Sequence, residues 1–233
     1  MRHYNSIELD ATYYKIYGTE NIQKWADKAI ENDFLFCPKM YNWVTHFGNF
    51  KGKDLLTTEF LKGVLAFGKY LGPIFIQMSE SFSPNRKHEL FAYLQTLPKD
   101  LQFFVEVRHP EWFANAAITN ELFSTLQQLN MGAVITDASG KRACAHMYLP
   151  VAKTLRRYVA KSLHASDYTR IDEWVSRIKR WMYKGLSEVY FFMHMHNEAT
   201  SPELTVYLVD KLNKECGLKL QKPTFISQQQ NLF

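Results

Sequence analysis

Cysteine is scarce in this chain, and no two cysteines lie close together. Cys37, Cys144 and Cys216 are the three in 233 residues, and none is part of a CxxC pair. The spacing predicts neither a disulfide framework nor a zinc site, and it is typical of a reducing compartment. No apolar run approaches the roughly 18 residues of a membrane span, and MRHYNSIELD lacks an apolar signal-peptide core. We therefore expect a cytoplasmic protein without a membrane segment.

Several local motifs of catalysis are also missing. No GxGxxG follows an expected strand, which argues against a dinucleotide-binding sheet. The sequence has no P-loop, nucleophile elbow or HExxH motif, so a Ser-His-Asp hydrolase has no local support. The sequence leaves the cofactor, like the oligomeric state, unknown.

The composition is that of an ordinary globular protein, with 46% hydrophobic and 22% charged residues. The net charge is +5, and the positive residues are scattered except for the cluster Lys153, Arg156, Arg157 and Lys161. No repeat, linker or shift in composition divides the chain. We expect one domain over residues 1–233, in which residues 219–233 form a polar C-terminal tail.

Short apolar runs alternate with longer amphipathic runs along the whole chain. The expected strands are Ile7–Tyr14, Leu35–Tyr41, Pro73–Ser79, Phe103–His109, Ala133–Asp137, Arg157–Lys161 and Val189–Met195. Strict alternation of strands and helices predicts a parallel sheet, because each parallel strand needs a crossover. Seven strand–helix units are one short of a closed barrel. We therefore predict an α/β fold, a TIM-type (β/α)8 barrel with its first strand missing.

Polar residues stand near the carboxyl ends of most expected strands. In a barrel these ends open onto one mouth, where active sites lie, so the side chains are expected to converge there. The set is Glu8, Asp10, Lys39, Gln77, Glu106, Arg108, Asp137, Arg157, His194 and His196. The alternative interpretation is a neutral salt-bridge network that only shapes the mouth, because charges are costly to bury unless they are paired.

The charged members of this set suggest two roles. Lys39, Arg108 and Arg157 are candidates for binding a phosphate or carboxylate. Glu106 and Asp137 are candidates for a general acid or base, provided that burial and neighbours raise a pKa. Glu106 and Arg108 lie two residues apart on one strand face, so they are also expected to be able to pair with each other.

The two histidines of the last strand are the nearest approach to a metal signal. His194 and His196 would face the same side of the strand, and a carboxylate such as Glu8 would complete a site. Spacing alone is weak evidence, so no metal ligand is assigned. Glu8 and His194 are instead predicted as catalytic residues, Glu8 orienting a partner.

Five further residues are predicted to bind substrate. Tyr13 and Trp112 follow strand ends, where aromatic rings stack on a sugar or base, although core packing explains them equally well. His46 lies in a loop, His109 is fixed in direction by Pro110, and Gln77 ends an apolar strand.

The segments NSIELDATYY, LGPIFIQMSESF, FFVEVRHPEWF and VYFFMHMH occur in this order along most of the chain. With them the chain resembles the YecE-like family, the domain of unknown function numbered seventy-two. The resemblance implies a TIM-type barrel of uncharacterised activity. It also implies site residues at the matching motif positions, namely Glu8, Thr12, Tyr13, Lys39, His46, Gln77, Glu106, Arg108, His109, Trp112, Asp137 and Arg157.

The chain departs from the family pattern at two places. Family members begin with a strand that carries a GTSGW-like run, whereas Met1 here falls within the following helix. We expect a start at an internal methionine, because an open barrel would expose apolar strand edges; the alternative is a genuine seven-unit variant. A pair of asparagines usually ends the last strand, and His194 and Met195 stand there instead.

Three functional hypotheses follow. The first is an enzyme, a hydrolase, isomerase or lyase, that acts on a small anionic substrate, phosphorylated or carboxylated. The second is a barrel that binds or processes nucleic acid, with or without a metal. The third is a non-catalytic or truncated scaffold.

Overall fold

The structure is a computed structural model that describes residues 3–29, 34–138, 143–195 and 197–223. Short parallel strands follow one another through this part of the chain, in the same order in space as in sequence. The strands are β1 (Ser6–Leu9), β2 (Leu35–Pro38), β3 (Ile74–Gln77), β4 (Phe103–Glu106), β5 (Gly132–Ala138), β6 (Lys153–Val159) and β7 (Glu188–His194).

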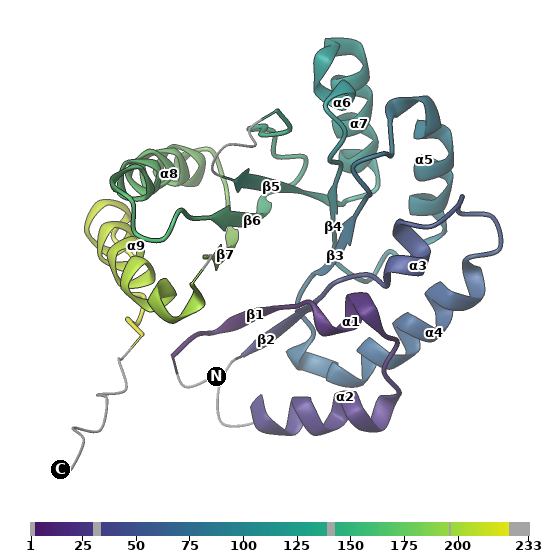
Figure 1. Cartoon of the computed structure of the whole chain (residues 1–233), viewed down its shortest axis with the longest axis horizontal. Helices are drawn as coiled ribbons and strands as arrows, with labels where there is room; N and C mark the ends of the chain where they lie inside the picture. Colours follow the sequence, from purple (N-terminus) through teal and green to yellow (C-terminus); the bar gives the residue numbers. More distant parts are fainter. Residues whose placement is uncertain (1–2, 30–33, 139–142, 196, 224–233) are drawn as a thin grey trace.

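Helices connect consecutive strands and surround the sheet (Figure 1). The α-helices are α1 (Ala11–Tyr14), α2 (Thr19–Ala26), α3 (Asn42–Thr45), α4 (Asp54–Val64), α5 (Lys87–Thr96), α6 (Glu111–Ala114), α7 (Ala116–Gln128), α8 (Ala165–Tyr183) and α9 (Ser201–Cys216). Short 3-10 helices are η1 (Asp27–Ala29), η2 (Leu65–Tyr70), η3 (Pro84–Arg86) and η4 (Glu198–Thr200). In the described residues no helix has both the length and the apolar character that crossing a membrane requires.

The sheet is parallel but does not close into a ring. β1 pairs with β2, and β3 to β7 pair in sequence. Two isolated bridges, Phe36 with Leu71 and Lys39 with Phe75, join the two parts. Within the described residues no backbone pairing joins β7 to β1. The prediction of a parallel α/β fold is confirmed, and the closed barrel is not.

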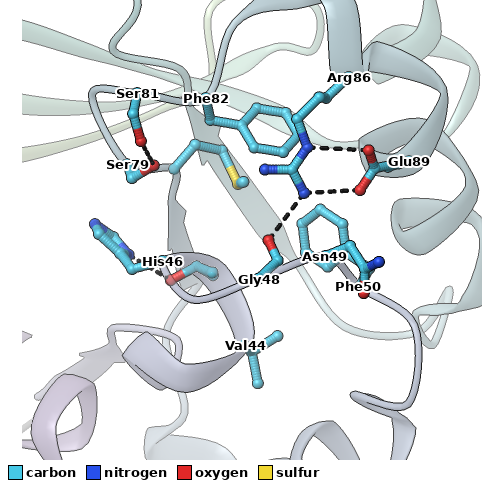
Figure 2. A pocket seen from close by; sticks show the side chains of 12 residues that line it. Val44, His46, Gly48, Asn49, Phe50, Ser79, Ser81, Phe82, Arg86 and Glu89 are labelled. Carbon is cyan, nitrogen blue, oxygen red and sulfur yellow. Dashed lines mark hydrogen bonds and ion pairs between the residues drawn. The ribbon is translucent and has the colours of Figure 1, made fainter.

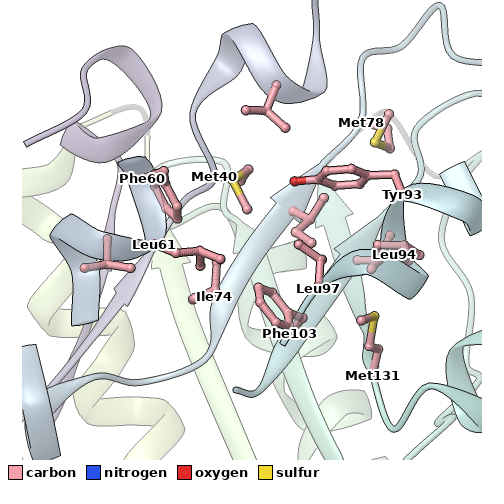
Figure 3. Close-up of a cluster of buried hydrophobic side chains, with 14 of the residues drawn as sticks. Met40, Phe60, Leu61, Ile74, Met78, Tyr93, Leu94, Leu97, Phe103 and Met131 are labelled. Atoms are coloured by element: carbon pink, nitrogen blue, oxygen red, sulfur yellow. The ribbon is translucent and has the colours of Figure 1, made fainter. Parts of the chain in front are cut away.

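Apolar side chains fill both faces of the sheet, as strands covered by helices require. The inner face holds a cluster of one residue from each of six strands: Cys37, Phe75, Phe104, Val134, Leu155 and Phe192. Gly132 faces the Phe104 ring, whose nearest atom would lie 2.1 Å from an added Cβ atom. Outside the sheet, one cluster packs under helices α4 to α7 (Figure 3), and another packs under α8 and α9.

Most expected strand boundaries differ from the observed ones, and the two largest differences are in β1 and β6. Ala11–Tyr14 forms α1 rather than the end of the first strand, and β6 begins at Lys153 rather than Arg157. The sequence pattern misses the start of β6 because Arg156 is charged, which is unusual inside a strand. In the structure this residue is 1% exposed and lies over the ring of Trp174 in α8. At the C-terminus, Leu220 exchanges hydrogen bonds with the Asn213 side chain of α9, and residues 224–233 of the predicted tail lie outside the described residues.

Candidate functional site

The inner face of the sheet carries charged and polar side chains directly beyond its apolar cluster. Lys39 and Arg157 both lie over the ring of Phe75, with charged groups 5.4 Å from its centroid. Residues two positions along a strand share a face, so each strand that contributes an apolar residue to the inner face contributes its next inner residue to this layer. We call this layer the mouth cluster: Glu8, Lys39, Gln77, Glu106, Thr136, Arg157 and His194.

Glu8 links the two ends of the open sheet through side chains. Its Oε2 accepts from Arg157 Nε of β6 at 2.9 Å and contacts His194 Nε2 of β7 at 3.0 Å. Burial raises the pKa of the Glu8 carboxyl, but the hydrogen bond with His194 and the charge of Arg157 outweigh burial. The pKa therefore lies below its usual range, and Glu8 is ionised at neutral pH.

The second oxygen of Glu8 has a different environment. The side chain is 3% exposed, and among the described residues no hydrogen-bond partner reaches Oε1. A buried acceptor without a partner costs about 1–3 kcal/mol, more if it is charged. Such an atom can accept a hydrogen bond from water or from a bound group.

Glu106 is held by three neighbours. Gln77 Nε2 donates to Oε2 at 2.6 Å, and Thr136 Oγ1 donates to Oε1 at 2.6 Å. Arg157 Nη1 lies 3.9 Å from Oε2. Both oxygens are thus engaged, so Glu106 fixes Arg157 and is less accessible to a substrate than Glu8 is.

Lys39 lies at the rim beside an aromatic ring. Its Nζ is 3.2 Å from Asp10 Oδ1 and 4.5 Å from the centroid of Tyr13. Thr12 positions the lysine, because its Oγ1 donates to Lys39 O and accepts from Lys39 N. The turn Asp10–Tyr13 after β1 therefore holds the cation that ends β2.

Arg108 extends the rim beyond β4. It pairs with Glu80, not with Glu106, so the expected pairing along one strand is wrong. Both oxygens of Glu106 already accept hydrogen bonds from Gln77 and Thr136, whereas Glu80 lies in a loop and is accessible to Arg108. His109 turns to its own loop, where its Nδ1 accepts from the backbone N–H of Glu111.

His46 lies between the rim and the adjoining loop. Its ring contacts that of Tyr13 edge-on at 5.2 Å, and its Nδ1 is 2.8 Å from Thr45 Oγ1. Burial, together with the positive charges of Lys39 and Arg108, lowers the pKa of His46 to about 4. The imidazole is therefore neutral at neutral pH.

A hollow of about 510 Å³ adjoins the mouth cluster at His46. Figure 2 shows Ser79 and Ser81 near His46, and Arg86 opposite them. Arg86 donates to Glu89 and to the backbone oxygen of Gly48 at 2.9 Å. The hollow therefore lies beside the charged layer, because His46 lines it and the His46 ring contacts Tyr13, over which the Lys39 ammonium lies.

Two predicted site residues face away from the mouth. Asp137 follows the inward-facing Thr136 and points outward, where Arg170 Nη2 and Trp174 Nε1 contact its carboxylate at 3.0 and 2.8 Å. Trp112 is fully buried, and its Nε1 donates to Phe82 O at 2.9 Å. The structure does not bring either residue to the mouth cluster. The predicted ligand His196 lies outside the described residues.

Comparison with known proteins confirms the family resemblance that the sequence motifs indicated. The family described as protein of unknown function DUF72 matches residues 1–229. The chain belongs to this family. The UPF0759 protein YecE of Escherichia coli K12 is 26% identical over 250 residues, which cover 100% of this chain and 90% of that protein.

Solved structures of DUF72 proteins share the fold. One from Enterococcus faecalis V583 has a TM-score of 0.73 and 19% identity, covering 94% of this chain and 92% of that one. Another from Thermotoga maritima MSB8 has a TM-score of 0.60 and 17% identity, covering 91% and 84%. At these identities the likeness concerns the fold alone, and DUF72 membership names no reaction.

The DUF72 chain also holds site residues that strand-end reasoning missed. Thr136 precedes the strand-end residue Asp137, and it shares the inner face with Val134, two positions earlier in β5. Glu80 lies in a loop, where no periodicity reveals its direction. Within the described ranges, no group of three or more His, Cys, Asp or Glu side chains is arranged to hold a metal ion.

Proposed function

We propose that the mouth cluster is the active site of an enzyme that moves a proton on a small carboxylate substrate. The observation that carries the proposal is the buried Glu8, with one oxygen engaged by Arg157 and His194 and the other without a partner among the described residues. A substrate hydroxyl that donates to Oε1 would satisfy this acceptor.

His194 is the proposed base. Ionised Glu8 accepts the Nε2–H of the imidazole, which leaves Nδ1 to take a proton from substrate. A carboxylate that orients a histidine in this way also stabilises the imidazolium that forms. His194 is 27% exposed in its side chain, so it is accessible from the mouth. Proton abstraction from carbon by this base would begin an isomerisation or an elimination.

The proposed anion contacts are Lys39 and Arg108. Both lie close enough to His46 to lower its pKa, so an anion beside His46 would be attracted to both. Arg157 is engaged by Glu8 and Glu106, and we assign it to holding those carboxylates.

The charge balance favours a carboxylate over a phosphate dianion. Ion pairs at the mouth and its rim unite three cations, Lys39, Arg108 and Arg157, with the carboxylates of Glu8, Asp10, Glu80 and Glu106. A second negative charge on the ligand would therefore meet a region that already holds one more carboxylate than cations.

The test is proton exchange in D₂O. Wild-type protein is expected to introduce deuterium at the carbon beside the carboxylate in members of a panel of small hydroxycarboxylates, followed by NMR. Glu8→Gln and His194→Gln should slow the exchange by about 10²-fold or more, the size of a general-base contribution. Equal exchange by wild type and both variants would contradict the proposal, and exposed Arg180→Ala on α8 is the matched control.

Nucleic-acid binding is a second candidate because aromatic rings are exposed close to the rim. Trp43 and Phe47 are 51% and 48% exposed, and their rings lie 4.8 Å apart. Exposed rings of this kind stack on bases in single-stranded nucleic acid. Retention on single-stranded DNA that falls steeply with salt would favour this candidate.

A further inference from the structure

The hollow beside the mouth cluster is continuous with the proposed anion contacts. His46 lines the hollow and contacts Tyr13, over whose ring Lys39 lies. On the other side, Ser79 and Ser81 line the hollow and flank Glu80, which pairs with Arg108. A ligand whose anionic group lies between Lys39 and Arg108 would therefore extend into this hollow.

The polar groups that line the hollow suit hydroxyls rather than a second charge. Arg86 and Glu89 neutralise each other in a two-point ion pair, so neither sign dominates. The hydroxyls of Ser79 and Ser81 lie 3.0 Å apart and each both donates and accepts. Neutral His46 adds its Nε2, since its Nδ1 already contacts Thr45 Oγ1 at 2.8 Å.

Aromatic rings complete the lining. Phe50 and Phe82 border the hollow, and their centroids are 6.1 Å apart. Phe82 is 2% exposed and lies beneath the Arg86 guanidinium, so Phe50 supplies the accessible ring surface. An aromatic ring beside uncharged hydrogen-bonding groups matches a polyol, whose C–H groups pack on the ring while its hydroxyls are hydrogen-bonded. The volume of about 510 Å³ falls in the range of small-molecule sites.

We infer that the substrate is a polyhydroxylated carboxylate, in chemical class a sugar acid. The carboxylate binds between Lys39 and Arg108, and the hydroxylated chain enters the hollow toward Ser79 and Ser81. This inference rests on the proposed function, since it names the substrate class of the same site.

Calorimetric titration with three six-carbon probes tests the inference. D-gluconate carries both the carboxylate and the hydroxyls, hexanoate carries the carboxylate alone, and D-glucose carries hydroxyls without a carboxylate. Each is titrated into wild type, Arg108→Gln, the double variant Ser79→Ala/Ser81→Ala and the control Ser124→Ala on the exposed face of α7. Ser79 is half-buried and Ser81 is exposed, and circular dichroism verifies that each variant is folded.

Gluconate is expected to bind wild type at least about tenfold more tightly than hexanoate or glucose, as two hydrogen bonds of about 1 kcal/mol would produce. The double serine variant should lose this advantage while hexanoate binding stays the same, and Ser124→Ala should change nothing. Equal affinity for gluconate and hexanoate, or unchanged gluconate affinity in the double variant, would overturn the inference. The proposed function would then stand if Arg108→Gln still weakened hexanoate binding, and it would fail if neither carboxylate bound.

Discussion

Two clusters of acids and bases lie on opposite faces of the same parallel sheet. The mouth cluster lies on the inner face. The second, which we call the outer cluster, lies between β5, β6 and α8 and consists of Asp137, Arg156, Asp167, Arg170 and Trp174. Thr136 and Asp137 are neighbours in β5, yet Thr136 donates to Glu106 on the inner face and Asp137 contacts Arg170 on the outer face.

The two clusters differ in how completely they are enclosed. In the outer cluster Asp167 is fully buried, its oxygens accept from the backbone N–H groups of Lys161 and His164, and Arg170 bonds to two backbone oxygens as well. At the mouth, the side chains of Arg157 and His194 are 15% and 27% exposed, whereas no charged side chain of the outer cluster is more than 7% exposed. The comparison suggests that enclosed polar groups serve stability, whereas those at an open rim serve binding.

The largest effect on stability is expected from Arg170→Ala. Arg170 Nη2 is 3.0 Å from Asp137 Oδ1, and Nη1 is 3.2 Å from Asp167 Oδ1. Removing it deprives two buried carboxylates of a cation, which costs about 3–5 kcal/mol of unfolding free energy. Denaturant unfolding measures the loss, and exposed Arg180→Ala on the same helix should change stability by less than about 0.5 kcal/mol. A loss for Arg170→Ala as small as that of the control would remove the distinction between the clusters.

A smaller effect is expected from Thr136→Val at the mouth. The substitution deletes the 2.6 Å hydrogen bond to Glu106 Oε1, and a hydrogen bond to a charged group contributes about 1.5–3 kcal/mol. We expect the loss of unfolding free energy to lie near the lower end of this range. Gln77 still donates to Glu106 Oε2, and water can approach Oε1 from the rim. Thr169→Val, exposed on α8, is the matched control in denaturant unfolding. A loss as large as that of Arg170→Ala would show that the mouth is as enclosed as the outer cluster.

The smallest effect on stability is expected from a change in pH. It depends on two histidines, His46 at the rim of the mouth and His146 in the core. Burial lowers the pKa of both His46 and His146 to about 4, with Lys39 and Arg108 adding to the shift at His46. The unfolded chain takes up these protons near pH 6.5, so stability is fully present above about pH 6.5 and falls as pH drops toward 4.

Added salt distinguishes the contribution of His46 to the pH dependence of stability from that of His146. Added salt screens the charges of Lys39 and Arg108 at the rim but leaves the burial of His146 unchanged. The decrease in melting temperature between pH 7 and pH 5 should therefore be smaller in His46→Gln than in wild type, and the difference should shrink with salt. An equal decrease in wild type and His46→Gln at low salt would show that His46 is not held neutral by the fold.

Much of the fold and part of the site could be predicted from local patterns. The strand positions of Glu8, Lys39, Glu106 and His194 follow from apolar runs and their ends, and the structure brings all four to one layer. Asp137 could not be placed in this way. β5 is apolar on both faces, so the pattern does not show whether Thr136 or Asp137 faces inward.

The sequence by itself determined the alternation of strands and helices, the DUF72 motifs and the residue types at the strand ends, because these depend on neighbours within a few positions. Only the tertiary structure decided which charges pair. Glu8 meets Arg157 and His194 across separations of 149 and 186 residues, and Arg108 finds Glu80 in another loop. Such partners are chosen by the curvature of the sheet and the packing of helices against it, which no short segment encodes.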